Sequence, residues 1–179
     1  SATLSINLPF GSGYLAEGTG VLLNNEMDDF SSKPGTPNAY GLVGNEANAI
    51  APEKRPLSSM TPSFVESENE IAILGTPGGS RIITMVFLGI LEHLQGKPAE
   101  DWVNRPRFHH QYLPDVIQHE PTAFSDETKK ALMDKGHKLK DVGRQYGNMH
   151  AILLNKKTGQ VTAASDKRAA GQAQVQAIK

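Results

Sequence analysis

Apolar and polar positions alternate with two different periods near the middle of the chain. Residues 63–65 and 71–74 are short apolar runs separated by a polar segment, a pattern that predicts a β-hairpin. Beyond a glycine-rich turn, apolar residues recur at the spacing of one helix face: Ile82, Ile83, Val86, Phe87, Ile90, Leu91 and Leu94. We therefore expect a helix after the hairpin, with Ser80 as its N-cap and with Gly96 and Pro98 ending it.

Further elements follow downstream. Pro98 suits the first turn of a short helix, and Ser125 and Gly136 suit the two ends of a longer one. The predicted elements are a helix at 98–104, strands at 107–111 and 115–119, a helix at 126–135, and a hairpin of 150–154 with 160–164. Strands, then helices, then strands indicate an α+β fold, with helices layered on a mostly antiparallel sheet.

The first third of the chain carries weaker signals. Residues 2–8 alternate and predict a strand already under way, so we expect a further strand upstream of them. Residues 21–23 are typical of a short buried strand. Residues 24–57 show no sustained period, and long segments of this kind are lids or binding loops when they are not disordered.

Composition narrows the class of protein. The chain has 179 residues, with 18 Lys and Arg against 19 Asp and Glu, so nothing favours binding to a polyanion such as nucleic acid. We expect a single domain, or a fragment of one, over residues 1–179. The absence of cysteine excludes disulfides, thiolate zinc sites and a cysteine nucleophile. The longest apolar run, residues 82–91, is too short to predict a membrane span.

The strongest local signal for chemistry is GTPGGSR at residues 75–81, between a predicted strand and a predicted helix. Backbone N–H groups of consecutive glycines at a helix start can bind an anion or an oxyanion. The motif matches neither the Walker loop nor GxGxxG. An ordinary glycine turn is an equally good interpretation from the local sequence.

An acidic run lies earlier in the chain, where Glu26, Asp28 and Asp29 place three carboxylates within four positions. They could bind a substrate ammonium group, act as an acid/base pair, hold a hard metal ion, or form a solvated acidic turn. The adjacent Ser58 and Ser59 could donate to a carboxylate, although serine pairs are also common in loops.

Two other features have a simpler explanation than a functional one. His109 and His110 are adjacent on a predicted strand, so their side chains should point to opposite faces and cannot easily share a metal ion. We expect a packed or exposed pair of rings. Ser1 could be an N-terminal nucleophile, but Ser-Ala is also a common remnant of an expression tag.

Considered together, these segments resemble the small subunit of the gamma-glutamyltranspeptidase family, and its bacterial members most closely. The order and spacing agree over nearly the whole chain. The segments that carry the resemblance are LLNNEMDDF (22–30), KPGTPNAYGLVG (33–44), KRPLSSMTP (54–62), GTPGGSRI (75–82), NRPRFHHQ (104–111) and AASDKR (163–168).

The resemblance implies an N-terminal nucleophile hydrolase, a four-layer αββα sandwich assembled from the large and small subunits of one self-cleaving precursor. In this family a threonine that opens the small subunit attacks γ-glutamyl amides such as glutathione, and water or an amino acid or peptide then accepts the γ-glutamyl group. The expected partner is the large subunit. No cofactor, metal or nucleic acid is implied, and a periplasmic or secreted location is expected.

The resemblance also implies roles for particular residues. Asn7, Glu26 and Asp29 match the positions that hold the α-amino and neighbouring polar groups of the glutamyl moiety. The hydroxyls of Ser58 and Ser59 match those that bind its carboxylate.

For the reaction centre, the resemblance assigns the oxyanion hole to Gly78 and Gly79. Residues 34–45 resemble the lid loop, with Tyr40 closing over the substrate, and residues 169–179 are expected to be a frayed tail. Ser5 stands where the family has a second threonine that supports the nucleophile.

The sequence departs from the family pattern in two further respects. The family's nucleophilic threonine should lie upstream of Ser1, so we expect the chain alone to be inactive and to be prone to self-association. In the last motif Lys167 replaces the usual proline. Two alternatives stay open: a cephalosporin (glutaryl) acylase of the same family, and a non-catalytic binding or assembly partner.

Overall fold

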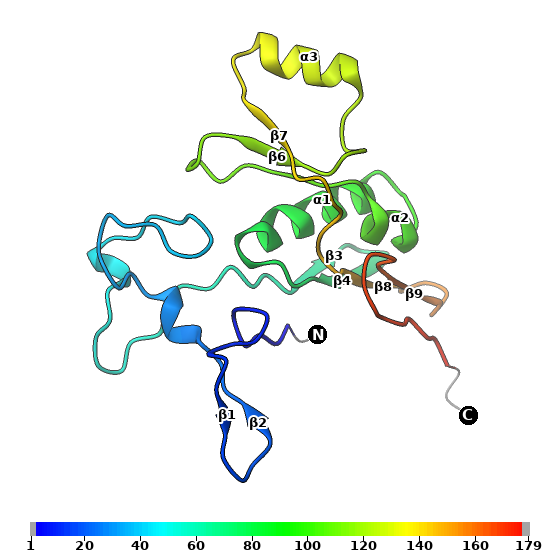
Figure 1. Cartoon of the computed structure of the whole chain (residues 1–179). Helices are drawn as coiled ribbons and strands as arrows, with labels where there is room; N and C mark the ends of the chain where they lie inside the picture. Colours follow the sequence, from blue (N-terminus) through cyan, green and yellow to red (C-terminus); the bar gives the residue numbers. More distant parts are fainter. Residues whose placement is uncertain (1–2, 177–179) are drawn as a thin grey trace. The chain divides into compact units, whose positions relative to one another are not determined.

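Four antiparallel strands form the main sheet of the computed structural model, which describes residues 3–176. Their order is β3 (Ser63–Glu66), β4 (Glu70–Gly75), β8 (His150–Asn155) and β9 (Val161–Ser165) (Figure 1). Both predicted hairpins are confirmed, as β3 with β4 and β8 with β9. The long-range pairing of β4 with β8 joins them into one sheet.

Two helices cover one face of this sheet. Helix α1 (Ile82–Leu94) spans the predicted apolar positions and ends before Gly96, and α2 (Ala99–Asn104) begins directly after Pro98. Gly89 allows the close approach of α1, because a Cβ there would lie 2.9 Å from Cδ1 of Leu74 on β4. The fully buried side chains between helices and sheet include Leu74, Met85, Trp102, Val103 and Met149.

The start of α1 differs from the prediction. Ser80 is not its N-cap: a 3-10 turn, η3 (Gly79–Arg81), precedes the helix, and the residue at the cap is Arg81, which makes no side-chain capping bond. The hydroxyl of Ser80 instead donates to Oε1 of Gln111 at 2.6 Å. A side chain distant in sequence therefore competes successfully with the local cap.

A three-stranded sheet follows in the chain: β5 (Phe108–His109), β6 (Ile117–His119) and β7 (Leu139–Asp141). The first two strands are shorter than predicted. Strand β7 was not predicted, because it has one apolar residue and pairs in parallel with β6 across helix α3 (Asp126–Asp134). Helix α3 is confirmed, and the Ser125 hydroxyl accepts from the N–H of Thr128 at 3.1 Å.

The described residues divide into two compact units, a smaller one of Leu4–Ser59 and a larger one that contains the sheets above. The smaller unit has a two-stranded hairpin, β1 (Leu15–Ala16) with β2 (Val21–Leu22), and two 3-10 turns, η1 (Glu26–Asp29) and η2 (Glu46–Asn48). The absence of longer elements in residues 24–57 agrees with the unperiodic sequence.

Two predictions for the smaller unit are wrong. Residues 3–8 form no strand, because Asn7 has φ +69° and turns the backbone; residue 2 of that prediction lies outside the described residues. Val21 is 53% exposed, so residues 21–23 are not a buried strand. Between residues 3 and 176 no helix combines the length and apolar character needed to cross a bilayer.

Candidate functional site

Four side chains predicted for the site meet within the smaller unit, and we call Asn7, Glu26, Asp29 and Tyr40 the acidic cluster. The Tyr40 hydroxyl donates to Oδ1 of Asn7 at 2.7 Å. The amide of Asn7 also donates to the backbone oxygen of Asn25 at 3.1 Å, and it hydrogen-bonds to the Asp29 carboxylate. Residues separated by up to 33 positions therefore converge on one patch of oxygen acceptors.

The 3-10 geometry of η1 selects two of the three carboxylates in the acidic run. Residues three apart in a 3-10 helix lie on the same side, so Glu26 and Asp29 face the same way. Asp28 points elsewhere, and its Oδ2 accepts from the side-chain amide of Asn25 at 2.7 Å. The sequence could not rank the three carboxylates, because it does not distinguish a 3-10 turn from an irregular loop.

Burial and negative charge dominate the electrostatics of the acidic cluster. Burial, and then the negative charge of Glu26 and its hydrogen bond to Asp29, raise the pKa of Asp29. Burial, followed by the charges of Asp29 and Glu26, raises the pKa of Tyr40. A cation bound here would relieve this repulsion, so the cluster is suited to an ammonium group.

Residues 34–45 hold Tyr40 through an Asx turn that the prediction missed. Oδ1 of Asn38 accepts from the backbone N–H groups of Tyr40 at 2.9 Å and Leu42 at 3.0 Å, and a bridge joins Pro37 to Val43. The NAYG sequence is a turn signal that could have revealed this role of Asn38. The lid function of this segment stays a prediction.

The predicted serines differ in what the structure shows of them. Ser5 is exposed, and its hydroxyl accepts from the N–H of Asn7 at 2.7 Å, so it supports the turn that presents Asn7. Ser58 is exposed and Ser59 is half-buried, in a segment without regular structure that begins where Leu57 N–H donates to Oδ1 of Asn48 at 2.9 Å. The roles of Ser58 and Ser59 in carboxylate binding stay predictions.

The glycine turn lies in the larger unit, at the end of β4. Gly78 has φ +152° and Gly79 has φ +59°, and a Cβ on Gly78 would lie 2.4 Å from Cε of Met85. Thr76 is buried, and its hydroxyl accepts from the N–H of Asn148 at 3.2 Å. Position 78 therefore requires glycine. The chain continues from this turn through η3 into α1.

The two adjacent histidines have different surroundings, as expected for a strand. His109 is buried, and its ring bonds to Thr84 at 2.8 Å and Gln111 at 2.9 Å. His110 is exposed and pairs with Asp115 at 3.0 Å. Among residues 3–176 no group of three or more His, Asp and Glu side chains is placed to hold a metal ion.

The larger unit also contains a buried ion network, formed by Arg107, Glu120, Asp166 and Arg168. Arg107 pairs with Asp166 at 2.6 Å, and Arg168 pairs with Glu120 at 2.8 Å and Asp166 at 3.1 Å. Glu120 also accepts from the N–H of Tyr146 at 2.9 Å. The network fixes the segment that begins at Tyr146, and the sequence did not reveal it because its members lie in separate motifs.

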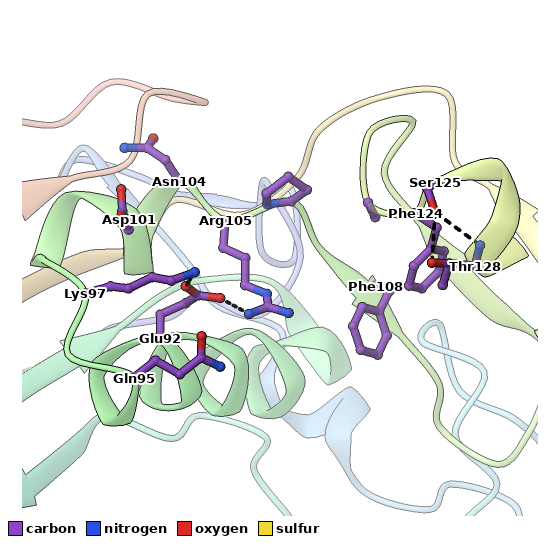
Figure 2. A pocket seen from close by; sticks show the side chains of 12 residues that line it. Glu92, Gln95, Lys97, Asp101, Asn104, Arg105, Phe108, Phe124, Ser125 and Thr128 are labelled. Atoms are coloured by element: carbon purple, nitrogen blue, oxygen red, sulfur yellow. Dashed lines mark hydrogen bonds and ion pairs between the residues drawn. The ribbon is translucent and has the colours of Figure 1, made fainter.

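A cavity of about 640 Å³ lies beside the C-terminal half of α1, and none of the predicted site residues lines it (Figure 2). Glu92 is buried there and pairs with Lys97 at 2.5 Å and with Arg105. At the other end of the cavity the rings of Phe108 and Phe124 are in contact, with centroids 5.1 Å apart. Because Glu92, Lys97 and Arg105 pair with one another, we interpret them as a structural link between α1 and the chain that follows it.

Comparison with solved structures defines the class of protein. The chain matches a gamma-glutamyltranspeptidase from Pseudomonas nitroreducens complexed with L-DON, at 44% identity and a TM-score of 0.89, over 98% of this chain and 92% of that one. A cephalosporin acylase from Bacillus halodurans is similar in fold alone, at 23% identity and a TM-score of 0.70, over 94% of this chain and 30% of that one. The α+β fold is that of the N-terminal nucleophile hydrolases.

The chain belongs to the gamma-glutamyltranspeptidase family, since the model of that family matches residues 1–176. The glutathione hydrolase proenzyme of Escherichia coli (strain K12) is 45% identical over 170 residues, which cover 94% of this chain. The match spans only 29% of the length of that relative.

Proposed function

We propose that the chain is the small-subunit part of a gamma-glutamyltranspeptidase. The enzyme would transfer the γ-glutamyl group of glutathione and related γ-glutamyl amides to water, or to an amino acid or peptide, through an ester with a threonine. The observation that carries this proposal is the acidic cluster, in which two neighbouring carboxylates and an amide oxygen converge, and in which burial and then the charge of Glu26 raise the pKa of Asp29.

The cluster would bind the α-ammonium group of the γ-glutamyl donor. An ammonium group has three N–H donors, and the carboxylates of Glu26 and Asp29 with Oδ1 of Asn7 offer acceptors for them. The raised pKa of Asp29 fits this role, because the bound positive charge would favour the ionised form of that carboxyl. Ser58 and Ser59 would donate to the α-carboxylate of the donor.

The larger unit would supply the stabilisation of the transition state. Backbone N–H groups at Gly78 and Gly79 would donate to the oxygen of the attacked γ-carbonyl as it gains negative charge. Gly78 cannot be replaced without displacing Met85, which supports a precise backbone conformation there.

A glutaryl acylase is the weaker candidate within the fold. Its substrate head group is a plain dicarboxylate, which brings no ammonium to satisfy Glu26 and Asp29. The likeness to the cephalosporin acylase supports the fold alone. A non-catalytic assembly partner would have no need for a strained glycine turn together with an ammonium site.

The expected partner is the large subunit of the same precursor. The face of the main sheet opposite α1 carries a cross-strand row of Phe64, Ile73, Ile152 and Ala163. Phe64 is 61% exposed and Ile152 is 42% exposed. An apolar sheet face of this kind supports packing against a second sheet, as in an αββα sandwich. We also expect a periplasmic or secreted location.

The test compares γ-glutamyl p-nitroanilide with glutaryl p-nitroanilide, which lacks the α-ammonium group, in the assembled two-subunit enzyme. We expect the wild-type enzyme to prefer the γ-glutamyl donor. In Asp29→Asn, kcat/KM for that donor should fall by about 30- to 1,000-fold, equivalent to about 2–4 kcal/mol of lost transition-state binding, and the preference should largely disappear.

Asp28→Asn is the matched control, because Asp28 lies in the same turn but points to Asn25. It should leave the donor preference unchanged. A preference for the glutaryl donor would favour the acylase, and no turnover of either donor would favour the non-catalytic partner. A change of less than about threefold in Asp29→Asn would refute the ammonium site.

A further inference from the structure

The glycine turn is followed at once by an anchored side chain. Ser80 is the first residue after Gly78 and Gly79 that has a side chain, and its hydroxyl donates to Oε1 of Gln111 at 2.6 Å. Gln111 lies 31 positions further along the chain, just beyond β5. The end of the turn is therefore held by a tertiary contact as well as by the local backbone.

Gln111 is itself held in one orientation. Its Nε2 donates to the backbone oxygen of Leu113 at 3.0 Å, which leaves Oε1 as the acceptor for Ser80. The same Oε1 lies 2.9 Å from Nε2 of His109, whose Nδ1 lies 2.8 Å from the hydroxyl of Thr84. These contacts assign the hydrogen of the His109 ring to Nε2 and let Nδ1 accept from Thr84.

The contacts form a path that begins at Ser80 in η3 and ends at Thr84 in the first turn of α1. The path leads from Ser80 through Gln111 and His109 and returns to Thr84, one helical turn after Ser80. His109 is 4% exposed, and burial lowers its pKa, which favours the neutral ring that this pattern of donors requires. The path is therefore fixed by two elements, α1 and the chain around β5.

Three further contacts hold the same turn through the neighbouring residues Arg81 and Thr76. Arg81 donates to Oε1 of Gln118 on β6, and its guanidinium lies 4.7 Å from the centre of the Tyr146 ring. At the other end, Thr76 accepts from the N–H of Asn148. Both ends of the turn are anchored, while the two glycines between them have no side chains with which to fix their own torsions.

We propose that Gln111 is a positioning residue for the reaction, acting through Ser80 to hold the N–H groups of the Gly78–Gly79 turn where the oxyanion develops. This inference rests on the proposed function. Oxyanion stabilisation depends on donors that are aligned before the charge appears. Loss of the Gln111 acceptor frees Ser80, and the adjacent glycine peptides can then rotate away from the productive orientation.

The experiment uses the assembled two-subunit enzyme with γ-glutamyl p-nitroanilide. Gln111→Met keeps the size of the side chain and removes the acceptor, and kcat should fall about tenfold with KM within about twofold of wild type. Gln111→Glu keeps an oxygen acceptor for Ser80 but loses the Nε2 donor to Leu113, so its kcat should lie between those of wild type and Gln111→Met. Gln160→Met, at an exposed glutamine beside β9, is the matched control and should leave both constants unchanged.

A double-mutant cycle separates positioning from a general loss of stability. Ser80→Ala should lower kcat about as much as Gln111→Met, and the double variant should be no slower than the slower single variant, because both remove one contact. Effects that multiply in the double variant, or unchanged kcat in Gln111→Met, would overturn the inference. If Gln111→Met does not assemble, unchanged kcat in Ser80→Ala overturns it equally.

Failure of the proposed function gives a different result. In that case the wild-type enzyme shows no preference for the γ-glutamyl donor, or Asp29→Asn leaves that preference intact. An enzyme that depends on Asp29 but is insensitive to both Gln111→Met and Ser80→Ala refutes the inference alone. The kcat measurement is the decisive readout, because a contact that served stability only would change the thermal midpoint without changing turnover by the folded enzyme.

Discussion

At the scale of residues, one backbone turn decides which carboxylates of the acidic run come together, as Glu26 and Asp29 show. Both belong to an acidic run that admits several interpretations, including a solvated turn. The 3-10 turn η1 brings these two carboxyls into hydrogen-bonding contact and turns Asp28 toward Asn25. The pKa of Asp29 is raised first by burial and then by Glu26, so the chemistry of the pair is set by its surroundings.

This coupling predicts the pH dependence of donor binding. Ionised Asp29 is the form that binds an ammonium group, so kcat/KM for γ-glutamyl donors should rise as the pH increases through the pKa of Asp29. Glu26→Gln removes a negative neighbour that raises this pKa. In that variant the acidic limb of the profile should move to lower pH, while its plateau falls because one carboxylate has been lost.

The measurement is kcat/KM against pH for wild type, Glu26→Gln and the control Glu46→Gln, which changes an acid in η2. An acidic limb that stays in place or moves to higher pH in Glu26→Gln would contradict the coupling. Asp29 also affects folding in the protein without substrate. Because its pKa is higher in the folded state than in the unfolded chain, ionisation of Asp29 lowers the free energy of unfolding as the pH rises.

At the scale of elements, the buried ion network ties together segments with few local signals. Asp166, which directly follows β9, is fully buried at its side chain and pairs with Arg107 at 2.6 Å. Its Oδ2 also accepts from the N–H of Met149, just before β8, at 3.1 Å. Burial alone would raise the pKa of Asp166, but the N–H groups of Arg168 and Met149 and the charge of Arg107 outweigh it and lower the pKa.

Asp166→Asn should therefore lower the free energy of unfolding by about 3–5 kcal/mol, because it leaves the guanidinium of Arg107 buried without its counter-charge. The lowered pKa means that the stabilisation is present above the pKa of the unfolded chain and is lost as the pH falls through the folded value. Urea unfolding at neutral and acidic pH measures both effects, and the difference between wild type and variant should shrink in acid.

Lys167→Ala is the neighbouring control, because the Lys167 ammonium pairs with Glu100 in solvent. It should leave the urea midpoint unchanged. Equal losses of stability in the two variants would show that the network around Asp166 contributes nothing specific. At this position the backbone N–H of Lys167 donates to Oδ1 of Asn104 at 3.2 Å, a contact that the family's usual proline could not make.

At the scale of the whole molecule, the main sheet has one covered and one uncovered apolar face. Helices α1 and α2 cover the face that includes Leu74 and Ala151. The opposite face carries the row of Phe64, Ile73, Ile152 and Ala163 across all four strands. This arrangement supports the expectation of a large-subunit partner, and the free chain would bury the same surface by associating with itself.

We expect the isolated chain to sediment as oligomers at high micromolar concentration, and the double variant Phe64→Lys/Ile152→Lys to sediment as a monomer. Charges on the sheet face make its burial unfavourable. Val175→Lys, at an exposed apolar residue far from the row in sequence, should leave the oligomers unchanged. Analytical ultracentrifugation with circular dichroism as a control for folding tests this, and a monomeric wild-type chain would contradict it.

The sequence alone determined the elements whose signals are local. Helix α1, helix α3 and both hairpins of the main sheet follow from apolar period and turn residues, and the structure confirms them. The acidic run and the glycine turn were likewise visible as candidate chemistry, because residue type alone limits what such groups can bind.

Tertiary structure decided what depends on contacts between distant residues. It turned the backbone at Asn7, so that residues 3–8 form no strand and the Asn7 amide faces Tyr40. It placed β7 beside β6 through a pairing that no local pattern encodes. It also gave the Ser80 hydroxyl a hydrogen bond to Gln111 in place of the expected helix cap. The physical reason is the same in each case: a long-range hydrogen bond or a buried charge outweighs a local preference of about 1 kcal/mol, and no sequence window contains both partners.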